Sequence, residues 1–541
     1  MDEKPNMKLK KFSLMMVVGV IVTAPGMAAK PQPPNILFIF SDDHACRTIG
    51  AYGCGLHKTP NIDRIAEEGA VFLNSFCENS ICQPSRAAIL TGKHSHLNGV
   101  TDNGKPWDGT QLIFPRELKK AGYQTALRGK WHMVPAPENG EFDSWEVLDG
   151  FGHQGCYYTP EFLNENGTAT REGYSTDVIT DEAIKWLNEE RDPKKPFLMM
   201  CQYKAPHVPR MPALRYLDHY KDMEFPEPET LLDDYKGRPY LAKHWMPVAG
   251  SDAAINIFSE EEMDMLRGKI PVSKKMIGTS HYFDRMDPDV REKYFAAYEE
   301  ENREYIKMVQ SGELSLGGKK KTVADKKYRY QRFIKDYLRV VDGIDDNVGR
   351  LLKWLDDNKL ADNTIVVYSS DQSYFTGEHY MAEKRWMYEQ GLKMPFVIRW
   401  PGHIKAGTRH EAMIQNIDYA PTFLSAAGLS VPDEMQGRSL LPLFDGSTPD
   451  GWRDSVYYHY YAHGKHNVPR HDGVRSGRYK LINFYTDDAY EMYDFESDPN
   501  EMNNVFNNPE YKEVRKKMER ELTRQRKVND VPKAAFEPPY L

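Results

Sequence analysis

The sequence predicts an α/β protein in which a large, mostly parallel sheet lies between helices and is followed by a smaller α+β unit with an antiparallel sheet. Short, continuous apolar runs recur along the chain, as expected for strands that are buried on both faces. They occupy residues 35–40, 196–201, 364–368 and 395–400. Helical patterns lie between them, and strands that alternate with helices favour a doubly wound α/β domain.

Two of the helical patterns are well defined. The segment 59–65 has a capping threonine, a proline in the first turn and Gly69 as a stop signal. From Phe333 onward, apolar residues recur on one face at helical spacing. They are Ile334, Tyr337, Leu338, Val341, Ile344, Val348, Leu351 and Leu355. This second helix leads directly into the strand that begins at Thr364.

The pattern changes from about residue 430 to short aromatic runs at 456–458, 479–482 and 490–494. We expect antiparallel strands there, followed by a charged helix from Pro509 to about Lys527. Residues 235–330 are charged and show no sustained apolar period, so we predict an insertion over the main sheet, with solvated helices as the plain alternative. The predicted division is a main domain over residues 30–428 and a C-terminal subdomain over 429–541.

Composition excludes several classes of protein. The chain has 541 residues, of which 40% are hydrophobic and 28% charged, so it can bury a full-sized core. Its formal net charge is −8, whereas nonspecific nucleic-acid binders carry a basic excess. We therefore expect no nucleic-acid partner, and any anionic ligand must meet a local basic pocket.

Residues 1–29 have the features of a signal peptide. A basic start over residues 7–11 precedes an apolar run from Leu14 to Ala24 and small residues at 26–28. The run is shorter than the roughly 20 apolar residues of a comfortable membrane span, so an N-terminal anchor is the weaker alternative. We expect export to the periplasm or the medium, with no stable membrane span.

The cysteines do not form the main scaffold. Six are few for an exported protein of this size. Four of them lie within residues 46–82, and no pair has the CxxC spacing of a zinc or redox site.

Acidic residues follow two of the predicted strands. Asp42 and Asp43 come after the first run, and Asp371 with Gln372 after the run from Thr364. In open α/β sheets the ligand site lies outside the carboxyl ends of the strands. Three carboxylates and an amide oxygen suit a hard cation such as Ca²⁺ or Mg²⁺ better than zinc. A single Asp-Asp pair after a strand is often only a turn, and the second strand end is what strengthens the prediction.

The segment from Cys82 to Lys93, with the sequence CQPSRAAILTGK, is the most informative in the chain. A cysteine at the start of a short helix is favoured as an anion by the unpaired backbone N–H groups and the helix dipole. Arg86, one turn later, supplies a cation to that residue or to a bound anion. The plain alternative is a small buried cysteine in a proline turn.

These residues resemble the signature of the type I, formylglycine-dependent sulfatases of the alkaline phosphatase superfamily. C-x-P-S-R followed by T-G-K starts at Cys82, and the other family motifs occur in the family's order. They are SDDH at 41–44, GKWH at 129–132, APHVP at 205–209, SDQ at 370–372, GEH at 377–379 and KRxxYE at 384–389. The motifs span about residues 34–425, and the resemblance implies an alkaline-phosphatase-like α/β sandwich as the fold of the main domain.

The resemblance also assigns the cofactors. In the family the cysteine is oxidised by a maturation enzyme to formylglycine (3-oxoalanine), whose hydrated aldehyde is the nucleophile. It therefore implies Cys82 as the nucleophile precursor and a maturation enzyme as a partner. It further implies a Ca²⁺ or Mg²⁺ site made by Asp42, Asp43, Asp371, Gln372 and the converted Cys82.

The resemblance assigns further catalytic residues, and the chemistry of a sulfate ester fits them. Arg86, Lys130 and Lys384 are expected to surround the sulfate anion as a preorganised electrostatic clamp. The sugar alkoxide that leaves needs a proton, for which we select His207, with Lys384 as the second choice. His132 is the family's base for the step that expels sulfate and restores the aldehyde.

Two positions depart from the family pattern. Gln372 stands where many sulfatases carry Asn or His. The glutamine side chain still offers a ligand oxygen, but with a longer reach. The residues Met381-Ala382-Glu383 before Lys384 replace the more usual small or acidic residues, which affects substrate contacts rather than the lysine.

The substrate expectation is a sulfated glycan. The segments around 371–379, 384–389 and 471–475 are similar to those of bacterial N-acetylglucosamine-6-O-sulfatases, which implies a 6-O-sulfated glucosamine from heparin, heparan, keratan or mucin glycans. His379, Arg385, His471 and Arg475 are the candidate substrate contacts, with a solvated strand face as the alternative for Arg475.

Three other functions stay open at this point. A sulfatase for another sugar keeps the mechanism but not the substrate contacts. A phosphonate or phosphodiester hydrolase of the same superfamily is separated by its activity on phosphate esters. A non-enzymatic glycan-binding protein would be favoured by loss of a core catalytic residue, and the motifs retain all of them.

Overall fold

A computed structural model defines the fold of this chain. It describes Met1 and residues 32–150, 152–244, 248, 256–274, 276–318, 320–462, 466 and 468–537. The predicted signal peptide lies, except for Met1, outside the described residues and stays a prediction. Among the residues that are described, no helix combines the length and the apolar character needed to cross a membrane.

One mixed sheet of ten strands organises the described part of the chain, in the order β10-β2-β9-β8-β1-β7-β3-β4-β5-β6. Its strands are β1 Asn35–Ser41, β2 Ala70–Phe76, β3 Gln124–Gly129, β4 Ser144–Leu148, β5 Glu161–Asn164, β6 Gly167–Thr170, β7 Phe197–Gln202, β8 Thr364–Ser370, β9 Phe396–Arg399 and β10 Thr408–Gln415. The central strands β8, β1, β7, β3 and β4 run parallel to one another. The mostly parallel sheet is therefore confirmed.

The run at 395–400 differs from the prediction in direction. It forms β9, which pairs antiparallel with both β2 and β8. A continuous apolar run shows only that a strand is buried on both faces, and it does not fix the direction of the strand.

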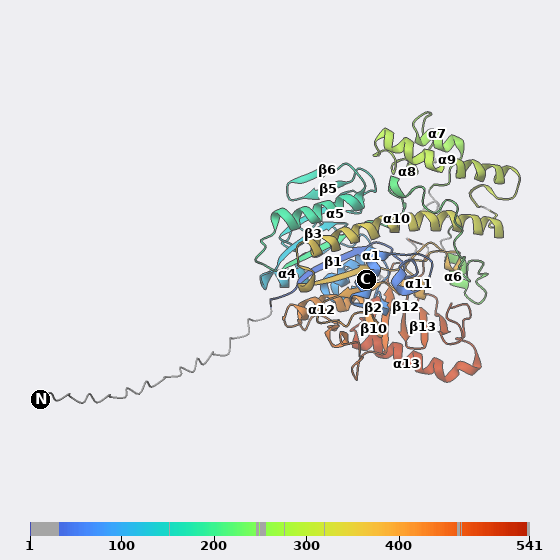
Figure 1. The fold of residues 1–541 in the computed structure, drawn as a ribbon. Helices are drawn as coiled ribbons and strands as arrows, with labels where there is room; N and C mark the ends of the chain where they lie inside the picture. The colour runs from blue at the N-terminus through green and yellow to red at the C-terminus, as the bar shows by residue number, and fades with distance from the viewer. Residues whose placement is uncertain are drawn as a thin grey trace. The chain divides into compact units, whose positions relative to one another are not determined.

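Helices cover both faces of the sheet (Figure 1). The described helices are α1 Pro60–Glu67, α2 Cys82–Thr91, α3 Ser95–Asn98, α4 Phe114–Lys120, α5 Ser175–Lys185, α6 Pro239–His244, α7 Glu260–Leu266, α8 Ile277–Ser280, α9 Pro288–Gln310, α10 Val323–Asp357, α11 Glu389–Leu392, α12 Tyr419–Ala426 and α13 Lys512–Val528. Helices α1, α5 and α10 pack on one face, and α2, α4 and α12 on the other. Alternate side chains of β1 point into these two cores, which explains its uninterrupted apolar sequence.

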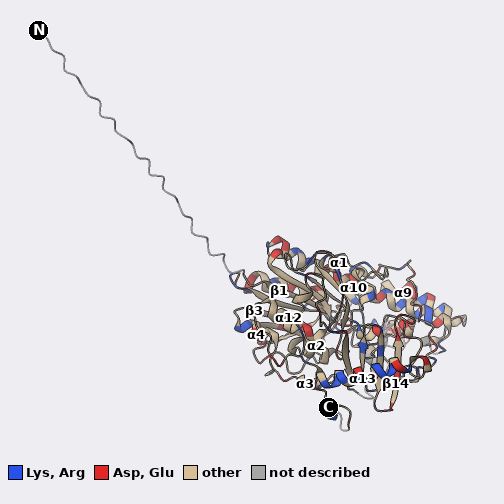
Figure 2. Cartoon of the chain, turned by 90° about the horizontal axis from the view of Figure 1, so that it is seen from below, with Lys and Arg blue, Asp and Glu red and all other residues tan. Residues whose placement is uncertain are grey.

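The predicted insertion forms an outer layer beside α10 rather than a cover directly on the sheet (Figure 1). Helix α9 buries its aromatic face, and Tyr298 donates a hydrogen bond of 2.7 Å to the carboxylate of Asp336 in α10. The buried residues of this face recur at helical spacing but are mostly aromatic, so a search for an aliphatic period missed it; they are Tyr294, Phe295, Tyr298, Asn302 and Tyr305. Figure 2 shows that charged residues of both signs alternate along α9, as on a solvated outer surface.

A second sheet of four antiparallel strands follows, in the order β11-β12-β13-β14. Its strands are β11 Ser455–Tyr460, β12 His471–Ser476, β13 Tyr479–Phe484 and β14 Ala489–Asp494. One face packs against the loop at 375–388, and the other against α13. The predicted antiparallel unit with a terminal charged helix is confirmed, whereas the domain boundary at 428/429 stays a prediction.

The position of the site follows from the order of the central strands. The four neighbours β8, β1, β7 and β3 run in the same direction, so their carboxyl ends meet at one edge of the sheet. Each of these ends leads directly into one of the predicted site segments.

Candidate active site

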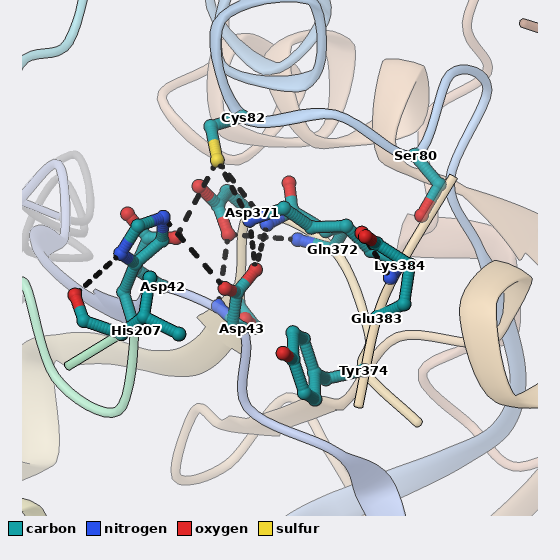
Figure 3. Close-up of polar contacts among 12 residues, drawn as sticks. Asp42, Asp43, Ser80, Cys82, His207, Asp371, Gln372, Tyr374, Glu383 and Lys384 are labelled. Carbon is teal, nitrogen blue, oxygen red and sulfur yellow. Dashed lines mark hydrogen bonds and ion pairs between the residues drawn. The ribbon is translucent and has the colours of Figure 1, made fainter. Parts of the chain in front are cut away.

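Three aspartates meet at the carboxyl ends of β1 and β8 (Figure 3). Ser41 and Ser370, the last residues of these strands, are partners in the parallel register, so Asp42, Asp43 and Asp371 emerge side by side. Their carboxylate oxygens lie within 4.8 Å of one another. All three side chains are buried, and three carboxylates this close repel one another unless cations compensate them.

The backbone between β1 and the site is shaped to turn Asp43 inward. Asp43 has a φ of 68°, in the left-handed region that aspartate tolerates better than most residues. The Tyr337 hydroxyl donates to its carbonyl oxygen at 2.6 Å, and its own N–H donates to the Asp371 carboxylate at 3.2 Å. These contacts from α10 and β8 hold the turn.

Three basic side chains compensate the three carboxylates. Arg86 Nε lies 3.1 Å from Asp371, and its terminal nitrogen lies 3.4 Å from Asp42. Lys130 Nζ is ion-paired with Asp42. Lys384 Nζ lies 2.6 Å from Asp43, and this neighbour raises the pKa of Lys384 although burial alone would lower it. Each carboxylate thus has a basic partner, although burial, opposed by Asp371, lowers the pKa of Lys130 well below its usual value.

Cys82 stands at the centre of this group as the first residue of α2. Its Sγ atom lies 3.2 Å from Lys384 Nζ, 3.5 Å from Gln372 Nε2 and 3.6 Å from Asp42 Oδ1. The side chain is 1% exposed, and burial raises the pKa of the thiol to about 11. The expectation of a stabilised thiolate is therefore wrong: desolvation outweighs the helix start and Lys384, so an unmodified Cys82 is a protonated thiol and a poor nucleophile.

The donor set fits a hard divalent cation. Three carboxylates supply oxygens from one small volume. The Gln372 Oε1 atom is buried and has no hydrogen-bond partner among the described residues, so it is a further free oxygen. An all-oxygen set of this kind suits Ca²⁺ or Mg²⁺.

Two predicted histidines line the same site. His207 follows β7, its Nδ1 lies 2.9 Å from the Val208 carbonyl oxygen, and its Nε2 lies 3.9 Å from the Asp43 carboxylate. His132 follows β3, and its Nδ1 is buried with no hydrogen-bond partner among the described residues. Burial, and then nearby cations such as Lys130, lower the pKa of both imidazoles well below the usual value, so both are neutral at pH 7.

Gly129 explains how Lys130 reaches the cluster. Gly129 has a φ of 106°, and a Cβ atom at this position would overlap the carbonyl oxygen of Gln202 in β7. Only glycine fits both the conformation and the space. The close approach of β3 to β7 carries Lys130 directly to Asp42.

The first two candidate substrate residues lie on the loop after β8. His379 is buried, and its Nδ1 lies 2.7 Å from Asp233, which also binds Arg238 at 2.6 Å. That arrangement ties the predicted insertion to the loop and leaves no contact between His379 and the carboxylate cluster among the described interactions. Arg385 pairs with Glu383 beside Lys384, so it lies next to the cluster.

The other two candidates lie on β12. His471 is buried among aromatic rings, with Trp386 at 6.0 Å and Tyr460 at 5.7 Å between centroids, and burial lowers its pKa to about 4. Arg475 Nε lies 2.9 Å from Glu389. The alternative of a solvated strand face is wrong for Arg475, because it is buried in an ion pair.

One charged residue of this region was missed. Lys204 lies two residues after the end of β7 and is buried. The rule that found the aspartates, a polar residue directly after a buried strand, could have found this lysine as well. It was passed over because Lys204 belongs to none of the family motifs.

Comparison with known proteins identifies the class. The sulfatase family model matches residues 34–429, and a model for the C-terminal part of N-sulphoglucosamine sulphohydrolase matches residues 377–528. The first match covers most of the chain, including every residue of the cluster. The chain therefore belongs to the sulfatase family.

Individual relatives indicate which kinds of sulfatase this chain resembles. The chain is 42% identical to an N-acetylglucosamine-6-O-sulfatase of Bacteroides thetaiotaomicron, over 97% of this chain and 93% of that protein. It is 27% identical to the human N-acetylglucosamine-6-sulfatase, over 84% and 72% of the two chains. A solved structure of a protein in complex with its substrate D-glucosamine-2-N,6-O-disulfate matches with a TM-score of 0.86 and 42% identity, covering 93% of this chain and 99% of that one.

Proposed function

We propose that this sulfatase removes the 6-O-sulfate from an N-acetylglucosamine or related glucosamine residue of a sulfated glycan. The observation that carries the reaction type is the buried cluster of Asp42, Asp43 and Asp371 with three paired cations around Cys82. The similarity to N-acetylglucosamine-6-O-sulfatases over nearly the whole chain supports the substrate.

Two groups complete the site in this proposal. Asp42, Asp43, Asp371 and Gln372 would hold a Ca²⁺ or Mg²⁺ ion, which would supply polarisation of the sulfate. Cys82, after its oxidation by a maturation enzyme, supplies an aldehyde hydrate with one hydroxyl for attack and a second for release. The thiol pKa of about 11 supports the need for this conversion.

The side chains around Cys82 divide the remaining work. Arg86, Lys130 and Lys384 bind the sulfate oxygens, and they are held in place before substrate arrives by their carboxylate partners. His132 is neutral and surrounded by cations, so it is ready to take the proton whose removal expels sulfate.

The proton for the leaving sugar has two possible donors in the site. The Nδ1 of His207 donates to the Val208 carbonyl, so its Nε2 carries no hydrogen while the ring is neutral, and the ring must first gain a proton. The Lys384 ammonium already carries its proton. We keep His207 as the donor, protonated together with binding of the sulfate anion, and Lys384 as the alternative.

The sugar is proposed to lie between the cluster and the second sheet. Arg385 and His471 are the contacts that we retain, since Arg385 adjoins Lys384 and the Nε2 of His471 is buried without a hydrogen-bond partner among the described residues. His379 and Arg475 are reassigned to holding the loop and the second sheet in place. Residues 1–29 would direct the protein out of the cytoplasm. Export would bring it to the glycans, which occur outside the cytoplasm.

The test is sulfate release from a panel of sugars by protein made with a maturation enzyme. The panel contains 6-sulfated N-acetylglucosamine, 6-sulfated N-acetylgalactosamine and 3-sulfated galactose, with Cys82→Ala as the control. Release from the first sugar alone, absent in the control, is expected. Release from another sugar would keep the sulfatase and discard the substrate.

A second measurement guards against a false negative. Mass spectrometry of the peptide that contains Cys82 shows whether the aldehyde is present. If the aldehyde is present and no sugar of the panel releases sulfate, the proposed substrate is refuted. Turnover of phosphonate or phosphodiester substrates under the same conditions would favour the related hydrolase class.

A further inference from the structure

Helix α13 is strongly basic on a chain that is acidic as a whole. Its 17 residues include eight basic and three acidic side chains, whereas the chain has a formal net charge of −8. Met518 and Leu522 are buried against the second sheet, so the opposite face of the helix is turned to solvent (Figure 1). The exposed basic residues lie on that outer face, and we call them the basic stripe. They are Lys512, Lys516, Lys517, Arg520, Arg524 and Lys527.

The protein itself neutralises only part of the basic stripe. Lys516 pairs with Glu513 at 2.9 Å, and Arg524 pairs with Glu521 at 2.6 Å. The other four residues of the stripe form no ion pair with any described residue. From its first to its last residue the stripe spans about 22 Å along the helix axis. It is therefore long enough to meet several units of a linear polyanion.

A cavity adjoins the C-terminal half of α13. Its volume is about 460 Å³, and it lies between this part of the helix and the start of β11. Three arginines, two acids and a tryptophan contribute to its lining: Arg438, Arg453, Arg524, Asp454, Glu521 and Trp452. An aromatic ring beside a few polar groups is typical of sites for small ligands.

Arg438 is the arginine of this cavity that lacks a carboxylate partner. The carboxylate of Asp418 is held by Arg453 at 2.6 and 2.7 Å. The Arg438 guanidinium makes one hydrogen bond of 3.4 Å, to the Gly451 carbonyl oxygen, and no ion pair with a described residue. Partial desolvation and then repulsion by Arg453 lower the pKa of Arg438. A bound oxyanion would relieve this repulsion and accept the paired N–H donors of the guanidinium.

This surface is separate from the site around Cys82. One face of the second sheet packs against α13 and the other against the loop at 375–388, so the sheet lies between them. At the cavity, the N–H of Gln436 donates to the carbonyl oxygen of Gly92 at 2.9 Å, and Gly92 ends α2. Cys82 begins that helix of ten residues, which is about 15 Å long.

We propose that the basic stripe and the cavity form a second, non-catalytic binding surface for a chain of sulfated sugars. Sulfate groups repeat along such a chain as cations repeat along α13. In the cavity, Arg438 binds one sulfate, and the ring of Trp452 contacts the apolar face of its sugar. The choice of ligand rests on the function proposed above, because the substrate is itself a sulfated glycan. The surface would hold a long glycan on the enzyme while its sulfates are removed elsewhere.

The test measures the Kd of a heparin decasaccharide for the Cys82→Ala protein, which does not consume the ligand. The triple variant Lys516→Gln, Arg520→Gln and Lys527→Gln removes three charges from the basic stripe. We expect it to raise Kd about ten- to hundredfold at about 0.1 M salt, because each lost cation weakens binding to the sulfates. Arg438→Gln alone should raise Kd about three- to tenfold.

The matched control removes three exposed charges from α9. It combines Lys293→Gln, Arg303→Gln and Lys307→Gln, so it makes the same substitutions on another surface helix. Arg303 pairs with Glu299 on its own helix, as Lys516 does with Glu513, so each triple variant breaks one exposed ion pair. The control should change Kd less than about threefold. With Cys82 intact and converted, every variant should release sulfate from 6-sulfated N-acetylglucosamine at the wild-type rate.

A competition measurement needs none of the surface variants. Saturating 6-sulfated N-acetylglucosamine fills the catalytic site and should leave the decasaccharide bound. Its displacement, or equal Kd values for the two triple variants, would overturn the inference. A DNA duplex that bound equally tightly, with the same loss in the stripe variant, would also overturn it, since the stripe would then serve polyanions in general. Absence of sulfate release by aldehyde-bearing enzyme, with decasaccharide binding intact, would instead refute the proposed function alone.

Discussion

Replacing Lys384 with methionine separates the two tasks of this lysine. The ammonium group neutralises Asp43 at 2.6 Å and stands 3.2 Å from Cys82 Sγ. Methionine keeps much of the side-chain volume and removes only the charge. The variant therefore loses both a cation of the proposed sulfate clamp and the partner of a buried carboxylate.

The expected magnitudes follow from these contacts. At 2.6 Å and an effective dielectric constant of about 20, the gross attraction is about 6 kcal/mol. Breaking one side of a buried pair typically costs about 3–5 kcal/mol of stability. For a cooperative unit of about 500 residues this lowers Tm by about 3–5 °C. Loss of one preorganised donor to the transition state lowers kcat by about 10²–10³.

The metal response makes the prediction specific. Without Lys384, the three aspartates have lost one of their cations, so a divalent ion should stabilise the variant more than the wild type. Tm is measured with a chelator and with excess Ca²⁺, and kcat by sulfate release at saturating Ca²⁺. We expect Ca²⁺ to restore most of the lost Tm and none of the lost kcat.

The control for this experiment is Lys119→Met. Lys119 Nζ forms a half-exposed ion pair of 2.8 Å with Asp143, and such pairs contribute at most about 1 kcal/mol. It should leave both Tm and kcat almost unchanged. A Lys384→Met variant that kept more than a tenth of wild-type kcat, or that gained no more from Ca²⁺ than the wild type, would refute the assignment.

Three other perturbations give distinct outcomes. Gly129→Ala should cost at least about 2 kcal/mol in urea unfolding and reduce turnover strongly, because the new Cβ displaces the Gln202 carbonyl; an unchanged midpoint would contradict the packing argument. His471 takes up a proton near pH 6.5 when unfolded but only at about 4 when folded, so its contribution to stability is present above pH 6.5 and lost as the pH falls towards 4, by up to about 3 kcal/mol. His471→Phe should therefore flatten Tm against pH between 4 and 6.5, and an unaltered slope would count against it. Arg475→Met should lower Tm by only about 1–3 °C, because Glu389 keeps its pair with Lys480 at 3.0 Å, and sulfate release should keep its sugar preference; a changed preference would show that Arg475 contacts substrate.

The sequence was sufficient to predict β1, β7 and β8 among the strands that lead into the site, but not β3. Continuous apolar runs end in Asp42-Asp43 and in Asp371-Gln372, and the parallel register of β1 and β8 brings these ends together. That part of the prediction depends only on strand burial and on a rule about strand ends. Which histidine faces which carboxylate depends on backbone turns that no spacing encodes, such as the φ of 57° at His132.

Two other features were not predicted, and the first of them depends on the environment created by folding. The helix start alone favours the thiolate form of Cys82. Burial of the whole side chain has the opposite effect and raises the pKa of the thiol. Helix α9 escaped detection because tyrosine and phenylalanine, not aliphatic residues, make its buried face. These residues recur at helical spacing, so a period that counted aromatic side chains would have found the helix.

The enclosure of Cys82 also has a consequence for biosynthesis. Under the proposed function a maturation enzyme would need access to the peptide around Cys82, and in the folded chain this peptide is the covered first turn of α2. The carboxylate cluster around Cys82 forms only when β8, nearly 300 residues further along the chain, pairs with β1. The conversion proposed for Cys82 would therefore have to precede the pairing of β8 with β1.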